Sequence, residues 1–241
     1  MWNKPLELLR NKWTEVPAGN TRVRTTDLGS VSDRDLLDFW NKTRIDSTTG
    51  TAFDVRGWYH LLYIDILKSK SVMDVGSGFG IDGITFAQNG ANVTFVDIVE
   101  SNLDILRRIC SLLDIKNVQF HYLESFDSLV KLPDNFDVIW CQGSIINLPF
   151  EIACIETKEL LRHLPIGGRW IELAYPKERW VKEGKMSFDK WGEKTEGWAP
   201  WVEWYDYEKF VKRFEPAKFN TLLHFNFHND DFNWFDVIRT R

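Results

Sequence analysis

Short apolar runs alternate with segments of helical periodicity along most of the chain. The apolar runs are five to seven residues long, as in strands buried on both faces, and they lie at 71–75, 92–97, 117–123, 136–141 and 168–174. Segments with apolar residues three and four positions apart predict helices at 33–42, 58–67, 81–89, 102–113, 126–131, 152–164 and 206–214. Strands and helices that alternate in this way build βαβ units. We therefore predict an α/β fold with a doubly wound, mostly parallel sheet and helices on both faces.

Polar residues and glycine mark several of the predicted helix ends. Ser32, Ser101 and Asp206 stand where a side chain can accept a hydrogen bond from the first helical turn, so we expect each to be an N-cap. Gly90 follows the helix predicted at 81–89 and is the expected C-terminal cap. Asp82 has the position of a first-turn helix charge.

The last part of the chain predicts a hairpin. Two strand-like runs, 219–227 and 232–240, are separated only by residues 228–231. This connection is too short for the crossover that parallel neighbours require, so the two runs must pair antiparallel. Together with the preceding runs they give a seven-stranded sheet with a C-terminal antiparallel hairpin.

Two regions do not fit the alternating pattern. Residues 1–55 are polar and irregular apart from the helix at 33–42, and we expect an N-terminal extension or cap on a domain that spans 56–241. Residues 175–204 connect the fifth strand to the last helix and are dense in tryptophan. A connection of this length in a compact domain is usually a functional loop. We therefore predict an aromatic lid over the substrate.

The first predicted strand leads into the strongest chemical signal in the chain. Asp74 precedes a glycine loop of Gly76, Gly78 and Gly80, and a second acid, Asp97, ends the following strand. Glycine lets the backbone turn tightly and approach a ligand closely, and an acid after the second strand can accept hydrogen bonds from ribose hydroxyls. The arrangement predicts a site for a cofactor that contains adenosine.

The register of the glycines decides between two cofactors. Gly78, Gly80 and Gly83 match the dinucleotide pattern G-x-G-x-x-G, but this match begins only after the apolar strand has ended. In the register that the strand sets, Ile81 takes the place of the last glycine. An acid at Asp74 would repel a pyrophosphate, whereas it suits the ammonium group of a methionine moiety. The chemistry therefore favours S-adenosylmethionine over NAD.

With these features the chain resembles the class I (Rossmann-like) S-adenosylmethionine-dependent methyltransferases. The resemblance covers roughly residues 55–240, and beyond the glycine loop it rests on segments in the family's order at 93–97, 118–125, 136–149 and 160–173. It implies an enzyme that moves a methyl group from S-adenosylmethionine. Two alternatives lie outside this class: an NAD-dependent oxidoreductase, supported by the offset glycine match, and a non-catalytic relative that serves as a binding module.

The resemblance also implies which residues hold the cofactor. Asp74 and the glycine loop face the methionine and the ribose, and Asp97 takes the ribose hydroxyls with Ile98 packed on the adenine. The end of the third strand flanks the adenine, and the sheet opens toward cofactor and substrate after the fourth. The full set is Asp74, Gly76, Ser77, Gly78, Gly80, Asp97, Ile98, Glu124, Ser125 and Gln142.

Departures from the family's pattern limit the chemistry of the acceptor. Cys141 and Gln142 stand where metal-dependent catechol-type relatives carry an aspartate, so we predict no catalytic metal. Asn147 replaces the histidine that relatives often carry after the fourth strand. The chain also lacks an Asn-Pro-Pro-Tyr-like motif, which counts against methylation of amide and exocyclic amino nitrogens.

The aromatic segment indicates the kind of acceptor. Trp180, Trp198 and Trp201 are interleaved with charged residues such as Arg179, and we expect these four residues to bind the substrate. Amphipathic rings of this kind suit a polar ligand with apolar faces, such as a sugar. We therefore expect O-methylation of a hydroxyl on a saccharide or a saccharide-bearing metabolite.

A hydroxyl acceptor also needs a general base to take its proton. The candidate catalytic residues are His60 and Tyr59, which lie just before the first strand, and Glu172 in the fifth strand. An amine acceptor would need less help from a base, and tryptophan faces could hold its cation. N-methylation of a small amine is therefore the alternative within the class.

Composition and charge narrow the partners. The 241 residues suffice for one sizeable α/β domain with an extension. A net charge of −5 argues against a nucleic-acid acceptor, because neutralisation of phosphates supplies most of the affinity for nucleic acids. A small-molecule acceptor is therefore expected.

No apolar run is long enough to cross a bilayer, and the start lacks a signal-peptide pattern. The three cysteines are odd in number and lack metal-ligand spacing, which favours a reduced cytoplasmic protein.

Overall fold

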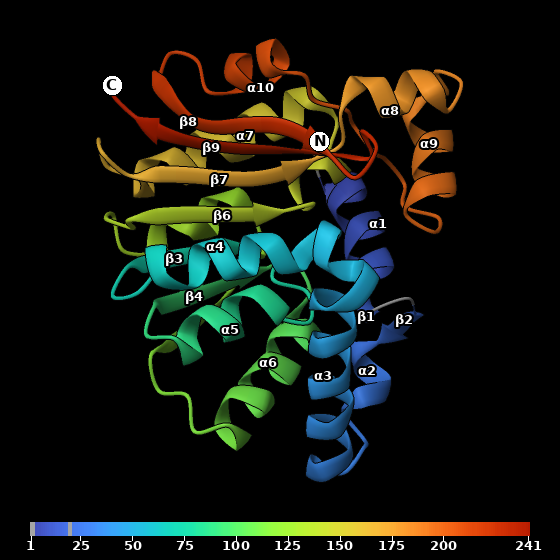
Figure 1. Cartoon of the computed structure of the whole chain (residues 1–241), viewed down its shortest axis with the longest axis vertical. Helices are drawn as coiled ribbons and strands as arrows, with labels where there is room; N and C mark the ends of the chain where they lie inside the picture. Colours follow the sequence, from blue (N-terminus) through green and yellow to red (C-terminus); the bar gives the residue numbers. More distant parts are fainter. Residues whose placement is uncertain (1–2, 19–20) are drawn as a thin grey trace. The chain divides into compact units, whose positions relative to one another are not determined.

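The computed structural model describes the backbone of residues 3–18 and 21–241 (Figure 1). The chain folds into two compact units. The first, here called the glycine-loop unit, consists of Trp13–Leu123, and the second, the aromatic unit, consists of Met1–Lys12 and Glu124–Arg241. The domain boundary expected after residue 55 lies inside the glycine-loop unit, and the division into an extension and a domain stays a prediction.

The glycine-loop unit is built on parallel strands joined by helices. Its strands are β3 (Ser71–Val75), β4 (Asn92–Asp97) and β5 (Val118–Tyr122), in the order β5-β4-β3. The helices α5 (Ile81–Gln88) and α6 (Glu100–Leu112) connect them and pack against β4. β3 and β4 are buried at every position except the first, which is why their sequences are continuous apolar runs rather than alternating ones.

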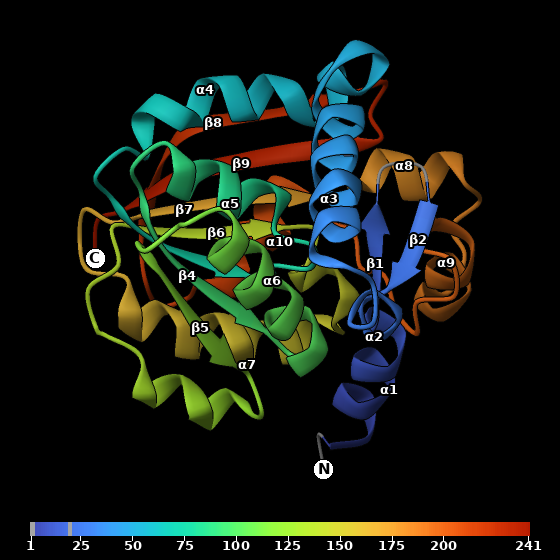
Figure 2. The same ribbon diagram turned by 90° about the horizontal axis from the view of Figure 1, so that it is seen from below.

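The start of this unit is more regular than predicted. Its elements are β1 (Glu15–Ala18), β2 (Thr21–Arg24), α2 (Thr25–Leu28), α3 (Asp33–Thr48), η1 (Gly50–Ala52), η2 (Phe53–Gly57) and α4 (Trp58–Ile66). β1 and β2 form an antiparallel hairpin beside α2 and α3 (Figure 2). The sequence pattern did not predict this hairpin, because strands of four residues are too short to show alternation. Val16 of β1 is buried, with 1% of its surface exposed, whereas β2 is exposed or half-buried.

The aromatic unit contains the remaining strands and the tryptophan-rich segment. Its elements are α1 (Asn3–Trp13), η3 (Phe126–Lys131), β6 (Val138–Gln142), η4 (Ile145–Asn147), α7 (Phe150–Leu160), η5 (Leu161–His163), β7 (Arg169–Ala174), α8 (Lys177–Lys182), α9 (Phe188–Thr195), α10 (Tyr207–Arg213), β8 (Phe219–Phe227) and β9 (Phe232–Arg239). β6 and β7 are parallel, β9 runs antiparallel to β7, and β8 pairs antiparallel with β9. The segment expected to be a lid is therefore partly helical, because it contains α8 and α9.

The strand order confirms the predicted fold class. In the described part of the chain the main sheet has seven strands in the order β5-β4-β3-β6-β7-β9-β8. It is mostly parallel, it ends in the C-terminal antiparallel hairpin, and helices pack around it. Within the ranges 3–18 and 21–241, no helix combines the length and the apolar character that crossing a bilayer requires.

Two of the predicted N-caps are confirmed and one is wrong. The Ser32 side chain accepts the Asp35 N–H at 3.1 Å, and Asp206 accepts the Lys209 N–H at 2.9 Å. α6 instead begins one residue before Ser101, whose hydroxyl lies 2.9 Å from that of Thr25. The cause is a stronger acceptor nearby, since the Asp97 carboxylate already binds the N–H of the residue that precedes α6.

Candidate functional site

The glycine loop turns the chain from β3 into α5. Gly80 precedes α5 with a φ of 68°, a left-handed conformation that suits glycine. A Cβ atom at this position would also lie 2.3 Å from Cδ2 of Leu106. Residues of the predicted cap contact the same loop: the Trp40 indole donates to the Phe79 carbonyl at 3.2 Å, and Val16 Cγ1 is the side-chain atom nearest to a Cβ added at Gly78.

Asp97 joins the end of β4 to this loop. Its Oδ2 accepts the Gly78 N–H at 2.9 Å, and its Oδ1 accepts the Val99 N–H at 2.8 Å and the Asn102 amide at 3.3 Å. Burial raises the pKa of Asp97 to about 6, although these donors act in the opposite direction. The structure thus brings the two predicted parts of the cofactor site, Asp97 and the glycine loop, into direct contact.

Asp74 is buried beneath the first turn of α5. It accepts the N–H of Gly83, and a Cβ atom on Gly83 would lie 2.5 Å from its Oδ2 and 2.4 Å from Cε1 of Phe95. Burial, together with the nearby carboxylates of Asp82 and Asp97, raises its pKa well above the ordinary value. The last glycine of the offset G-x-G-x-x-G match is therefore explained by close packing of helix on strand. Binding of the methionine ammonium by Asp74 stays a prediction.

The remaining residues assigned to the cofactor occupy different surroundings. The Ser77 hydroxyl donates to the Asp74 carbonyl at 2.8 Å, and Ile98 is half-buried. Glu124 and Ser125 are both exposed at the start of the second segment of the aromatic unit. Gln142 ends β6, and both terminal atoms of its amide are buried without a hydrogen-bond partner among the described residues.

The predicted bases His60 and Tyr59 lie together on α4, but both are already engaged. The His60 Nε2 lies 2.5 Å from Oδ1 of Asp82, and its ring packs between those of Tyr59 and Phe86. Tyr59 is hydrogen-bonded to Arg56, and burial raises its pKa above the ordinary value. Arg56 also lies 3.7 Å from Asp82. Asp82 is thus more than a first-turn helix charge. Its sign in the sequence is an ionisable residue in each of two neighbouring apolar helical segments, His60 in the first and Asp82 in the second.

Glu172 lies in a buried ion pair. Its carboxylate accepts a hydrogen bond from Arg213 at 2.9 Å and one from the Trp170 indole at 2.7 Å, and a second bond from Arg213 closes a bidentate pair. The Glu172 and Arg213 side chains are 1% and 0% exposed. The Glu172 carboxylate is thus engaged within the aromatic unit. Its assignment as a general base stays a prediction.

The four residues expected to bind substrate are partly brought together. Trp180 and Trp201 both pack on Phe188, with ring centroids 5.9 and 5.2 Å away. Arg179 lies over the Tyr175 ring at 4.2 Å and pairs with Glu183 at 3.0 Å, so its charge is used within the unit. Trp198 is 76% exposed and is the most accessible ring of the set.

Sequence reasoning missed a lysine of the aromatic unit whose ammonium group lies among aromatic rings. Lys209 Nζ lies 2.6 Å from the Glu203 carboxylate and 4.0 Å from the centre of the Trp204 ring. The rings of Phe150, Phe188 and Tyr205 lie 5.3 to 5.6 Å from the same ammonium group. No local sequence pattern predicts this cluster, because its residues come from α7, α9, α10 and the segment that connects α9 to α10.

This cluster is tied to the loop that follows β6. The Glu203 N–H donates to the Ile146 carbonyl at 2.7 Å, and the Asn147 amide donates to the Trp201 carbonyl at 3.3 Å. The aromatic segment therefore lies on the loop at the carboxyl end of β6, where α/β sheets bind ligands. Among the residues that the structure describes, no group of three or more His, Cys, Asp and Glu side chains could hold a metal ion. The expectation of a metal-free reaction stays a prediction.

Comparisons with known proteins agree with this geometry. A family model described as a methyltransferase domain matches residues 66–212, more than half of the chain. The mitochondrial ubiquinone biosynthesis O-methyltransferase of Schizosaccharomyces pombe is 30% identical over 106 residues, which cover 44% of this chain and 35% of that protein. Ribosomal RNA small subunit methyltransferase G of Clostridium perfringens is 26% identical over 156 residues, or 59% of this chain and 62% of that protein. The chain thus spans less than two thirds of these relatives.

A solved structure extends the similarity to the fold. The 1,6-didemethyltoxoflavin-N1-methyltransferase of Burkholderia thailandensis, with bound S-adenosylhomocysteine, gives a TM-score of 0.57 at 14% identity and covers 94% of this chain and 95% of that chain. One correction follows from the comparisons as a whole. Because one relative is named for ribosomal RNA, the net charge of this chain does not exclude a nucleic-acid acceptor.

The glycine loop held by Asp97, the strand order and the matching family model lead to the same result, which also settles the choice between S-adenosylmethionine and NAD. The chain belongs to the class I S-adenosylmethionine-dependent methyltransferase family.

Proposed function

We propose that this protein transfers a methyl group from S-adenosylmethionine to a small polar acceptor. The observation that carries the proposal is the contact of Asp97 with the glycine loop. The Asp97 carboxylate binds the Gly78 N–H with one oxygen, and the Val99 N–H and the Asn102 amide with the other. An acid at this strand end, beside a glycine loop, is placed to accept hydrogen bonds from ribose hydroxyls.

Gln142 is a second candidate for a ligand-binding residue. A buried amide without partners costs free energy, and both terminal atoms of Gln142 are in this state. Such a group is stabilised when a ligand supplies a donor and an acceptor. We assign Gln142 to contact with the bound cofactor or acceptor.

For the acceptor atom we favour an amine nitrogen over a hydroxyl. S-adenosylmethionine would supply an activated methyl group, so the chain mainly has to orient the acceptor and exclude water. A hydroxyl needs a general base, and two of the predicted bases are held by arginine, Tyr59 by Arg56 and Glu172 by Arg213. The aromatic unit already holds the Lys209 ammonium on ring faces, which is the chemistry that an amine substrate requires.

A saccharide hydroxyl remains the second candidate. The observation in its favour is the surface of Trp180 and Trp201 around Phe188, because flat aromatic faces suit the apolar faces of a sugar ring. In that case His60 is the candidate base, because Asp82 contacts one of its two ring nitrogens, Nε2, and can orient the ring.

Calorimetry and mass spectrometry test this proposal in two steps. We expect S-adenosylhomocysteine to bind the wild-type protein, NAD to give no saturable heat, and Asp97→Ala to weaken binding by about ten-fold or more, as expected for loss of charge-assisted hydrogen bonds. Small amines, saccharides and a ribosomal RNA fragment are then incubated with S-adenosylmethionine, and the product is sought as a mass increase of one methylene. Absence of S-adenosylhomocysteine binding would refute the methyltransferase proposal, and methylation of RNA or saccharide alone would refute the amine.

A further inference from the structure

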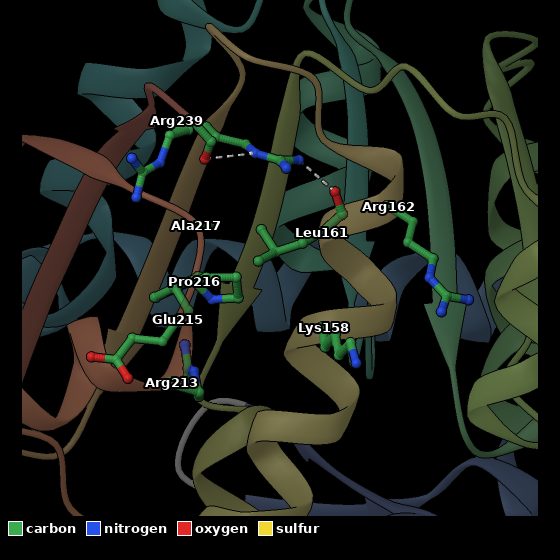
Figure 3. A pocket seen from close by; sticks show the side chains of 10 residues that line it. Lys158, Leu161, Arg162, Arg213, Glu215, Pro216, Ala217 and Arg239 are labelled. Atoms are coloured by element: carbon green, nitrogen blue, oxygen red, sulfur yellow. Dashed lines mark hydrogen bonds between the residues drawn. The ribbon is translucent and has the colours of Figure 1, made fainter.

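The aromatic unit contains a cavity of about 380 Å³ that the methyl-transfer proposal does not use. It is lined by the end of α7 and η5, by the residues that follow α10, and by the end of β9 (Figure 3). Arg169, the first residue of β7, is paired with Ile238 at this side of the sheet. The cavity therefore lies at the amino end of β7, whereas sheets of this kind bind cofactor and substrate beyond the carboxyl ends.

The walls of the cavity are largely apolar. Leu161 faces it from the helical side, and Pro216 and Ala217 face it from the chain after α10 (Figure 3). Phe214, which is buried, completes this wall. A volume of this size falls within the range of small-molecule sites, and these walls suit the organic part of a ligand.

The charges around the cavity are mostly positive. Two of the lining cations are neutralised elsewhere: Arg213 pairs with Glu172, and Arg162 pairs with Glu159 at 2.6 Å. Figure 3 shows the Arg162 side chain on the other side of the helix, away from the cavity. These two groups are therefore not available to a ligand.

Three further lining cations, Lys158, Arg239 and Arg241, have no carboxylate side chain as partner among the described residues. Arg239 is fixed in place by hydrogen bonds from its guanidinium to the carbonyls of Leu161, at 2.7 Å, and of Leu164. Glu215 is the acidic side chain of the lining. A local excess of positive charge thus persists in a protein whose net charge is −5.

We propose that this cavity binds an organic phosphate monoester. A phosphate monoester carries about −1.5 to −2 charges at neutral pH, and it matches a fixed guanidinium flanked by two further cations. The apolar walls then take the organic group. A neutral ligand would leave the cations without a counter-charge, and inorganic phosphate would leave the apolar walls without a contact.

Calorimetry with phenyl phosphate tests the proposal on the full chain. We expect saturable binding of phenyl phosphate that is about ten-fold tighter than that of phenol or of inorganic phosphate, and weaker at high salt. The variant Lys158→Met/Arg241→Met removes two cations whose side chains make no hydrogen bond or ion pair within the described residues. It should fold like the wild type and bind phenyl phosphate about ten-fold more weakly. Arg239 is left intact because it binds helix carbonyls.

Lys131→Met is the matched control, since Lys131 is a lysine at the end of η3 that does not line the cavity. It should leave binding unchanged. The proposal is overturned if the wild type gives no saturable heat, if phenol binds as tightly as phenyl phosphate, or if the double variant and Lys131→Met bind equally well. Tighter binding of benzoate, or displacement of phenyl phosphate by a short RNA at lower concentration, would also overturn it in favour of a carboxylate or a nucleic acid.

Discussion

Two pairs of buried carboxylates, one pair in each unit, are held in different ways. In the glycine-loop unit, Asp97 and Asp74 are bound mainly by backbone N–H groups, and the donors are Gly78, Val99 and Gly83. In the aromatic unit, Glu172 and Glu203 are bound by the side chains of Arg213 and Lys209, which are surrounded by rings. A backbone donor is positioned by the local conformation of the chain. A side-chain pair instead depends on two distant segments that fold against each other, so the two regions should respond differently to mutation.

The largest effect is expected where one partner of a buried pair is removed. Arg213→Met leaves the Glu172 carboxylate, which is 1% exposed, without a cation. Breaking a buried ion pair in this way costs about 3–5 kcal/mol. We therefore expect the free energy of unfolding, measured by urea denaturation, to fall by about this amount.

The double variant Glu172→Gln/Arg213→Met separates charge from packing. Since it removes both charges, it should recover a large part of the lost stability. If it is no more stable than Arg213→Met, the loss comes from packing against the rings of Trp170, Tyr205, Phe210 and Phe214, and the contrast between the two units is weaker than the structure suggests.

The second effect depends on pH and concerns Glu156 on α7. Burial raises the pKa of Glu156 from 4.5 to about 7, with Arg213 lowering it and Glu172 raising it. Between these two values the folded state keeps a proton that the unfolded state has lost, so the stability falls as the pH rises from about 4.5 to about 7. Glu156→Gln should remove this loss, and at pH 8 it should be more stable than the wild type by at most about 3 kcal/mol.

Thermal unfolding of both proteins from pH 4 to pH 8 measures this difference. The two curves should converge at pH 4, where the wild-type carboxyl group is protonated in both states. Glu151→Gln is the control, because Glu151 lies on the same helix and is exposed. A pH-independent gain for Glu156→Gln would assign the effect to packing rather than to titration.

The difference between carboxylates held by backbone groups and those held by side chains explains which parts of the site could be predicted. Asp97 and the glycine loop were predicted because a few consecutive residues specify both a strand end and a turn. The ion pair of Glu172 was not predicted, because Arg213 lies 41 positions away and neither segment contains a pattern that indicates the other. The prediction of Glu172 as a base assumed that a polar residue in an apolar strand serves chemistry, and the structure places this residue in a buried ion pair.

In the fold, too, the elements that depend on local sequence were the ones predicted. Continuous apolar runs predicted the parallel strands, and a short connection predicted the C-terminal hairpin, since both depend on local sequence. The β1–β2 hairpin was not predicted because its strands have four residues each, and the helices α8 and α9 lie in the aromatic segment that was predicted to be a lid. Their apolar residues contact distant segments, as when Val16 lies near the glycine loop.

A third prediction tests the glycine-loop unit itself. Gly83 lies inside α5, where helix propensity alone would make Gly83→Ala stabilising by about 1 kcal/mol. The structure predicts the opposite sign, because the new Cβ would lie 2.4 Å from the Phe95 ring and 2.5 Å from the Asp74 carboxylate. Overpacking of this kind costs about 1–3 kcal/mol, so unfolding in urea should begin at lower concentration and binding of S-adenosylhomocysteine should weaken.

Gly29→Ala serves as the matched substitution. Gly29 has a right-handed φ of −60°, and the nearest atom to an added Cβ is the Thr26 carbonyl oxygen at 3.3 Å. This variant should change stability by less than about 1 kcal/mol. Equal behaviour of the two alanine variants would show that close packing of α5 on β4 is not what requires glycine at position 83.

The smallest effect is expected at Lys209, where rings share the charge with a carboxylate. Lys209→Met keeps the apolar stem but removes the ammonium group from Glu203 and Trp204. Cation–π contacts at partly exposed sites contribute about 0.5–1 kcal/mol. The Lys209 side chain is 17% exposed against 0% for Arg213, so this ion pair is less enclosed and the unfolding free energy should fall by less than in Arg213→Met. The local effect should be larger, since Glu203 also binds the Ile146 carbonyl through its N–H. Hydrogen exchange of residues 201–205 should therefore become faster than in the wild type.

Lys209→Arg should preserve slow exchange because it retains charge and ring contacts. Lys212→Met, on the exposed side of the same helix, should leave exchange unchanged. If Lys212→Met accelerates exchange equally, the aromatic segment is held by the apolar packing of its rings, and the difference between backbone-held and side-chain-held carboxylates would not extend to the loop after β6.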